Sequence, residues 1–111
     1  MKKLITAMFI FLSCFTSKAF SDGHAIKMGI ILGFTGPIES LTPAMAASAE
    51  LAFKEASDSG KLLGGKSIMI ERADSTCVDS AAATTAAEGL VSDGVLAIMG
   101  ADCSGVTGAI A

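Results

Sequence analysis

Three short apolar runs alternate with two longer segments of helical periodicity, and this order limits the chain to few folds. The runs cover residues 26–33, 67–73 and 95–99. A nearly continuous apolar run such as the first is typical of a strand buried on both faces of a parallel sheet. With a further helix expected after residues 101–104, the order is β-α-β-α-β-α, and its short connections predict right-handed crossovers. We therefore expect an α/β fold of three layers, in which helices cover both faces of a parallel sheet.

The segment after the first run predicts a helix that starts near Thr42 and stops at Gly60. Thr42 is expected to cap this helix, and Pro43 is expected to occupy its first position. Glu50 and Lys54 stand four residues apart in the order that favours an ion pair. Apolar residues at helical spacing define its expected packing face. They are Met45, Ala49, Ala52, Phe53 and Ala56.

A second helix is expected between Asp79, which can cap its first turn, and Gly94, which ends it. The residues available for packing are Ala82, Ala83, Ala86, Ala87, Leu90 and Val91. A third helix is expected to begin after the loop 101–104. A sheet of three parallel strands would leave apolar faces and a strand edge uncovered, so we expect the chain to belong to a larger lobe.

The first 21 residues have the three-part pattern of a secretory signal peptide. Lys2 and Lys3 form a positive start, and the apolar stretch that follows them is too short to span a bilayer. Two cleavage sites fit, one before Phe20 and one before Asp22, and the second gives the mature chain a polar start. Cys14 offers an alternative, in which the mature protein begins with a lipid anchor. The mature part, taken as residues 22–111, is expected to work outside the cytoplasm.

Cleavage before Asp22 also changes the charge of the protein. It removes Lys2, Lys3 and Lys18, and leaves five basic and eleven acidic residues, a net charge of −6. An acidic surface argues against nucleic acid or an anionic membrane as a partner. The acids form no block, so most of them are expected to lie on a solvated surface.

The mature part keeps two cysteines, Cys77 and Cys103. An even pair in an exported protein predicts a disulfide. A metal pair and a reactive thiol are the competing interpretations. His24 is the single histidine, and two thiolates alone do not complete a zinc site, so the residues support no metal and no cofactor.

Ligands of open α/β sheets gather at the carboxyl ends of the strands, where three loops are expected. The first loop, 34–41, offers Glu39 and Ser40, and the third, 101–105, offers Ser104 and Gly105 at the start of a helix. Ordinary turn chemistry is the competing explanation for each loop. Residues 33–36 lack the G-x-G-x-x-G pattern, and Asp102 stands where a nucleophile elbow needs its first glycine, so no enzyme is expected.

Several segments, in order, carry a resemblance to a known family. They read IKMGIILGFTGP, AELAFKEASDSGKLLGGKSIMI and RADSTCVDSAAATTAAEGLVSDGVLAIMGADCSGVT. Together they resemble the N-terminal part of periplasmic substrate-binding proteins of the branched-chain amino acid type, the leucine-binding protein family, which feed ABC transporters. The resemblance implies a two-lobed clamshell of the type I periplasmic binding fold. Residues 22–111 would form the opening, incomplete part of its N-terminal lobe.

The resemblance also implies partners and site residues. The protein would capture a small amino acid or related solute and deliver it to an inner-membrane ABC permease. Cys77 and Cys103 would be bonded, and Ser104 would bind the ligand carboxylate through its hydroxyl and backbone. Leu41 stands near a position where the family often carries an aromatic residue, and the chain has no Tyr or Trp.

Three other functions remain open from the sequence: a sensory ligand-binding domain of the same fold, a binding protein for amides or urea, and an exported α/β enzyme. Since a clamshell uses both lobes to bind, residues 22–111 alone are expected to bind a solute weakly or not at all.

Overall fold

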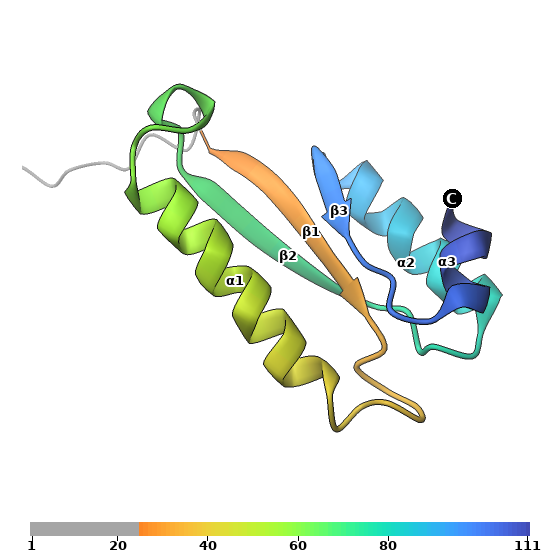
Figure 1. Ribbon diagram of the computed structural model, residues 1–111. Coiled ribbons are helices and arrows are strands. Elements are labelled where there is room, and N and C mark those ends of the chain that lie inside the picture. The colour runs from red at the N-terminus through yellow and green to blue at the C-terminus, as the bar shows by residue number, and fades with distance from the viewer. Residues whose placement is uncertain (1–24) are drawn as a thin grey trace, which may run out of the picture.

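The computed structural model describes residues 25–111, and the predicted signal peptide, its cleavage sites and Cys14 lie outside them. Strands and helices alternate in the predicted order (Figure 1). They are β1 (Ile26–Leu32), α1 (Thr42–Asp58), the short 3-10 helix η2 (Leu63–Gly65), β2 (Ile68–Asp74), α2 (Ser80–Ser92), β3 (Ala97–Met99) and α3 (Ser104–Ile110). The expected fold class, α/β with a parallel sheet, is confirmed.

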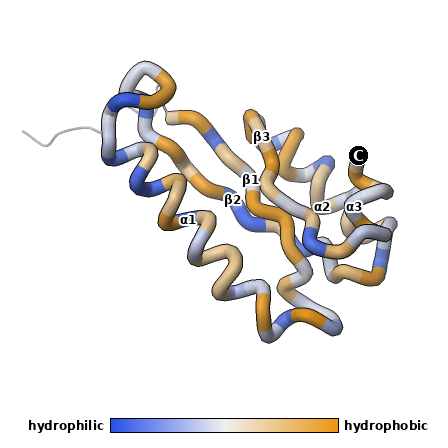
Figure 2. Tube along the Cα trace, in the orientation of Figure 1, coloured by the Kyte–Doolittle hydropathy of each residue, from blue (hydrophilic) through white to orange (hydrophobic). Residues whose placement is uncertain are grey.

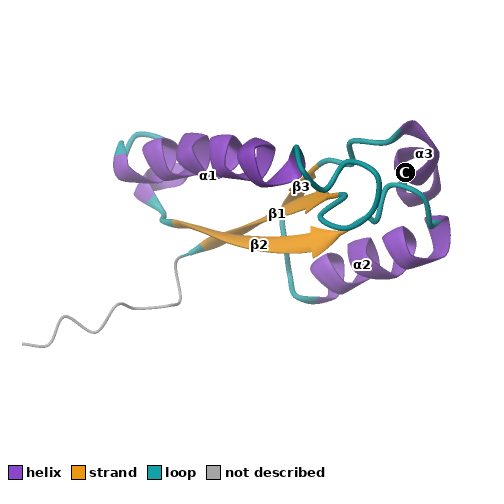
Figure 3. Cartoon of the chain, turned by 90° about the horizontal axis from the view of Figure 1, so that it is seen from below, coloured by secondary structure: helices purple, strands orange, loops and turns teal. Residues whose placement is uncertain are grey.

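The three described strands form one parallel sheet in the order β2-β1-β3. Ile26 is in register with Ile68 of β2, and Met28 is in register with Ala97 of β3. The central position of β1 explains its apolar sequence, because a middle strand is covered on both faces. Figure 3 shows α1 on one face of the sheet and α2 on the other, which gives the three predicted layers.

Consecutive residues of β1 point into opposite layers of the core. Ile30 and Leu32 pack with Ala46 of α1, while Ile31 packs with Ala87 and Leu90 of α2. All three β1 side chains are at most 1% exposed. Figure 2 shows this hydrophobic stretch at the carboxyl-terminal half of β1.

Gly29 has a packing role in the layer of α2. A Cβ atom at this position would lie 3.0 Å from Leu90 Cδ1 and 3.1 Å from Val95 Cγ1. The absence of a side chain therefore lets α2 approach the central strand closely.

Two details of α1 differ from the sequence prediction. Leu41, not Thr42, occupies the N-cap position, and no side chain caps the helix there. Thr42 is fully buried instead, and its Oγ1 donates a hydrogen bond to Gly33 O at 3.1 Å. Thr42 was expected to cap because it precedes Pro43, but its hydroxyl lies within reach of a backbone carbonyl at the end of β1 and bonds there.

The expected ion pair between Glu50 and Lys54 is also wrong. Glu50 pairs with Arg72 of β2, and Lys54 pairs with Asp58 one turn further along α1. Arg72 Cζ also lies over the ring of Phe34, 5.5 Å from the ring centroid. Residue spacing within one helix cannot reveal an ion-pair partner that lies on another element.

The packing faces of the helices are confirmed in part. Ala49, Phe53 and Ala56 of α1 are half-buried as expected, whereas Met45 and Ala52 are exposed and Ala46 is buried in their place.

In α2, Asp79 caps the helix by accepting from Ala81 N and Ala82 N, both at 3.0 Å. Ala83, Ala87 and Leu90 are buried, but Val91 is 64% exposed. None of the helices within residues 25–111 is both long and apolar enough to cross a membrane.

The burial of β1 predicts which substitutions unfold the protein. We expect Ile31→Ala to lower the free energy of unfolding by about 2–5 kcal/mol, because it removes packing and leaves a cavity beside α2. Leu51→Ala, at an α1 side chain that is 56% exposed, is the control and should change it by less than about 0.5 kcal/mol. Urea unfolding of the complete gene product measures both values, and equal effects would contradict the assigned core.

Candidate functional site

The loops that follow the strands meet at the carboxyl edge of the sheet (Figure 1). The first loop is 33–41, after β1. The second loop is 75–78, after β2, and the third loop is 100–103, after β3. This edge is where ligands of open α/β sheets bind.

The carboxylate of Asp74 joins the first loop to the second. It accepts hydrogen bonds from Thr35 Oγ1 at 2.6 Å, from Thr35 N at 3.3 Å and from Thr76 N at 2.8 Å. The two loops approach closely, since a Cβ atom on Gly36 would lie 2.5 Å from Thr76 O. Gly36 also has a φ of +95°, a conformation that glycine adopts readily and other residues rarely adopt.

The environment of Asp74 lowers the pKa of its carboxyl group. Burial alone would raise this pKa, but the hydrogen bonds from Thr35 and Thr76 favour the charged form and outweigh burial. Asp74 is therefore held as a carboxylate that fixes the geometry of two loops.

A disulfide joins the second loop to the third. Cys77 and Cys103 are bonded, with an S–S distance of 2.01 Å and a Cα–Cα distance of 5.2 Å. The pairing agrees with the sequence prediction. Gly33 lies against it, because a Cβ atom there would be 3.2 Å from Cys77 Cβ.

Asp102 joins the third loop to the first. Its Oδ2 and Oδ1 accept from Gly33 N at 3.0 Å and 3.3 Å, and Ser75 Oγ lies 3.5 Å from Oδ1. Ser75 is fully buried. Sequence reasoning did not identify this contact, since the only pattern noted at Asp102 was a missing glycine. An acidic residue directly before a predicted disulfide, in a loop at the carboxyl edge, was the available signal.

Ser104 and Gly105 are the first two residues of α3, and both are exposed. Within residues 25–111, the Ser104 hydroxyl makes no hydrogen bond. The N-cap residue Cys103 offers no side-chain acceptor to the first turn. The first amides of a helix have no partner inside the helix, so the hydroxyl and amides here remain available to a ligand.

Glu39 and Ser40 lie in the first loop, and both side chains are exposed. Glu39 N donates to Gly36 O at 3.3 Å, which forms a turn. No hydrogen bond or ion pair joins Glu39 or Ser40 to Ser104 or Gly105 in the described part of the chain. The structure thus places the four predicted site residues at one edge, in two separate pairs.

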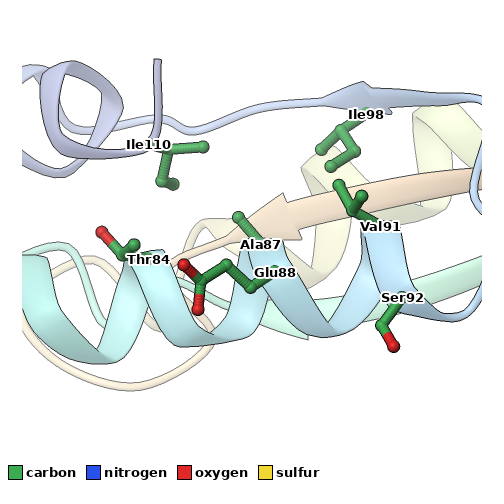
Figure 4. Close-up of a pocket in the computed structure, with 7 residues that line it drawn as sticks. All are labelled: Thr84, Ala87, Glu88, Val91, Ser92, Ile98 and Ile110. Carbon is green, nitrogen blue, oxygen red and sulfur yellow. The ribbon is translucent and has the colours of Figure 1, made fainter.

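Two surface hollows lie away from this edge. A groove between α2, β3 and α3 is mostly apolar (Figure 4). It is lined by Thr84, Ala87, Glu88, Val91, Ser92, Ile98 and Ile110. The second hollow lies at the amino edge of the sheet, and Lys27, Lys66 and Asp93 are among its residues. Neither hollow contains a predicted ligand residue.

No group of three or more His, Cys, Asp or Glu side chains in residues 25–111 is arranged to hold a metal ion.

A comparison with protein families assigns the chain to a family. The family model described as "Periplasmic binding protein" matches residues 25–111, which include every described strand and helix. A search of the curated proteins finds no significant match. The chain belongs to the periplasmic binding protein family. Membership implies that it binds a small solute, and the family is generally non-enzymatic.

The disulfide should contribute strongly to stability. Its cysteines are 26 residues apart, and closing such a loop stabilises by roughly 3.5 kcal/mol in the chain-entropy model. We expect the double variant Cys77→Ser, Cys103→Ser to lose about this free energy of unfolding in urea. A dithiol reductant should destabilise the parent protein by about this amount more than it destabilises the double variant. An equal effect of the reductant on both proteins would contradict this account.

The lowered pKa of Asp74 predicts a pH dependence of stability. A carboxyl with a lowered folded-state pKa stabilises the fold above its unfolded value of about 4, and this contribution is lost as pH falls through the folded-state value. We expect Asp74→Asn to be less stable than the parent protein at about pH 7, and the difference to shrink below about pH 4. Urea unfolding at a series of pH values tests this, and a difference that stays constant with pH would refute it.

Proposed function

We propose that this chain is the solute-capturing component of an ABC transporter, which binds a small amino acid of the branched-chain type and delivers it to an inner-membrane permease. Membership of the family supports the general function, which is binding of a small solute. The identity of the solute as an amino acid, and the permease as its destination, are proposed from the chemistry of the carboxyl edge.

The position of Ser104 is the observation that carries this proposal. Its hydroxyl is exposed at the carboxyl edge and has no hydrogen-bond partner among the described residues. The disulfide at Cys103 fixes the adjoining backbone to the second loop. A hydroxyl and neighbouring amides on a fixed backbone suit a carboxylate, which is an acceptor only.

Other features support an apolar amino acid as the ligand. Leu41 ends the first loop, and 61% of its surface is exposed. A branched aliphatic ligand could bury itself against such a side chain and gain free energy from the apolar area removed from water. Glu39 in the same loop could accept from an ammonium group.

We include a two-lobed architecture in the same proposal. Residues 22–111 would form the opening part of an N-terminal lobe, and a second lobe would close over the carboxyl edge. Val91 and Leu96 are 64% and 72% exposed, and the groove of Figure 4 is apolar, which supports cover by further protein. The disulfide and the leader-like first 21 residues support export to the periplasm.

Calorimetric titration of the complete gene product tests the ligand. We expect L-leucine, L-isoleucine or L-valine to bind, and L-leucinamide, which lacks the carboxylate, to bind at least about tenfold more weakly. Ser104→Ala should weaken binding of the amino acid by about tenfold, because a charge-assisted hydrogen bond is lost.

Ser48→Ala is the matched control, because Ser48 is exposed on α1 and bonds to Ala44 O of its own helix at 2.9 Å. It should leave the affinity unchanged. Equal affinities of the Ser104→Ala variant and the parent protein, or preferential binding of urea or acetamide, would reject the amino acid site.

A further inference from the structure

One carboxylate contacts the ends of two strands from the loop that follows the third. Asp102 precedes the N-cap residue of α3, and both of its oxygens accept from Gly33 N, at 3.0 Å and 3.3 Å. Oδ1 also lies 3.5 Å from Ser75 Oγ. Gly33 follows β1 and Ser75 follows β2, so Asp102 reaches across the whole carboxyl edge.

These contacts complete a closed set of links between the three loops. The bonds of Thr35 to Asp74 connect the first loop to the end of β2, where the second loop begins. The disulfide connects the second loop to the third, and Asp102 connects the third to the first. Each loop is thus held by the two others, and without one link two of the loops are joined only through the third.

The backbone amide of Gly33 requires an acceptor in any case. Gly33 is buried, and a buried N–H without a partner costs free energy. The carbonyl groups at the end of β1 have hydrogen-bond partners other than Asp102. Ser75 N donates to Leu32 O at 2.9 Å, and Thr42 Oγ1 donates to Gly33 O. The Gly33 amide is therefore the point at which the third loop is tied to β1.

We propose that Asp102 is a positioning residue, which holds Ser104 in a fixed place relative to Glu39 and Ser40 before any solute arrives. Its effect on solute affinity rests on the proposed function, whereas its effect on the loops does not. A preformed edge binds more tightly because less conformational freedom is lost on binding.

Three variants of the complete gene product separate positioning from general stability. Asp102→Ala removes the link. Asp102→Asn keeps an oxygen that accepts from Gly33 N. Asp79→Ala is the control, because it removes a carboxylate at the same edge that caps α2 and joins no loops.

Amide hydrogen exchange of the solute-free protein is the first measurement. We expect Asp102→Ala to increase exchange in residues 33–41 and 100–107 by about tenfold, and Asp102→Asn to restore most of the protection. Asp79→Ala should increase exchange at the start of α2 only. Unchanged exchange in residues 33–41 of Asp102→Ala, or an equal increase there in Asp79→Ala, would overturn the proposal.

Binding of L-leucine is the second measurement. We expect Asp102→Ala to weaken it by about tenfold, Asp102→Asn to recover most of the affinity, and Asp79→Ala to match the parent protein. Loss of affinity in proportion to stability in all variants would leave Asp102 with a structural role only. A parent protein that does not bind L-leucine would refute the ligand of the proposed function, and the exchange result would still decide the role of Asp102.

Discussion

The burial of β1 between two helices is the constraint on which the rest of the structure depends. Ile30 and Leu32 face α1, Ile31 faces α2, and none of the three is more than 1% exposed. Because side chains alternate along a strand, a shift of one residue would exchange the two layers of the core. The register of β1 with β2 and β3 therefore also decides where all three loops at the carboxyl edge begin.

The polar groups of the carboxyl edge bond to one another and so link its three loops. Asp74 and Asp102 each accept backbone hydrogen bonds from the first loop, and the disulfide adds a covalent link between the other two. The Ser104 hydroxyl has no partner in the described chain, although the two residues before it, Asp102 and Cys103, are bonded to the other loops. A fixed surface with an unused donor is suited to solute capture, because binding then orders little of the protein.

Local patterns were enough to predict the fold class, the order of the elements, the Asp79 cap and the cysteine pair. They failed where a polar side chain bonds to a partner in another element. Thr42 bonds Gly33 instead of capping α1, and Glu50 pairs with Arg72, 22 residues away. Asp102 was missed for the same reason, since Gly33 is 69 residues from it. The positions of Ser104 and Glu39 at one edge followed from the parallel sheet, but their lack of mutual contact did not.

The bonded cysteines have a consequence for how the exported chain matures. Cys77 follows β2 and Cys103 precedes α3, and the end of β1 lies between the two outer strands that they connect. Apart from Cys14, which the predicted signal peptide would remove, the sequence has no third cysteine. A single pair has one possible connectivity, so a general thiol oxidant suffices for its formation. Removal of the leader would thus leave residues 22–111 with a single possible pairing, so no mismatched disulfide can form within them.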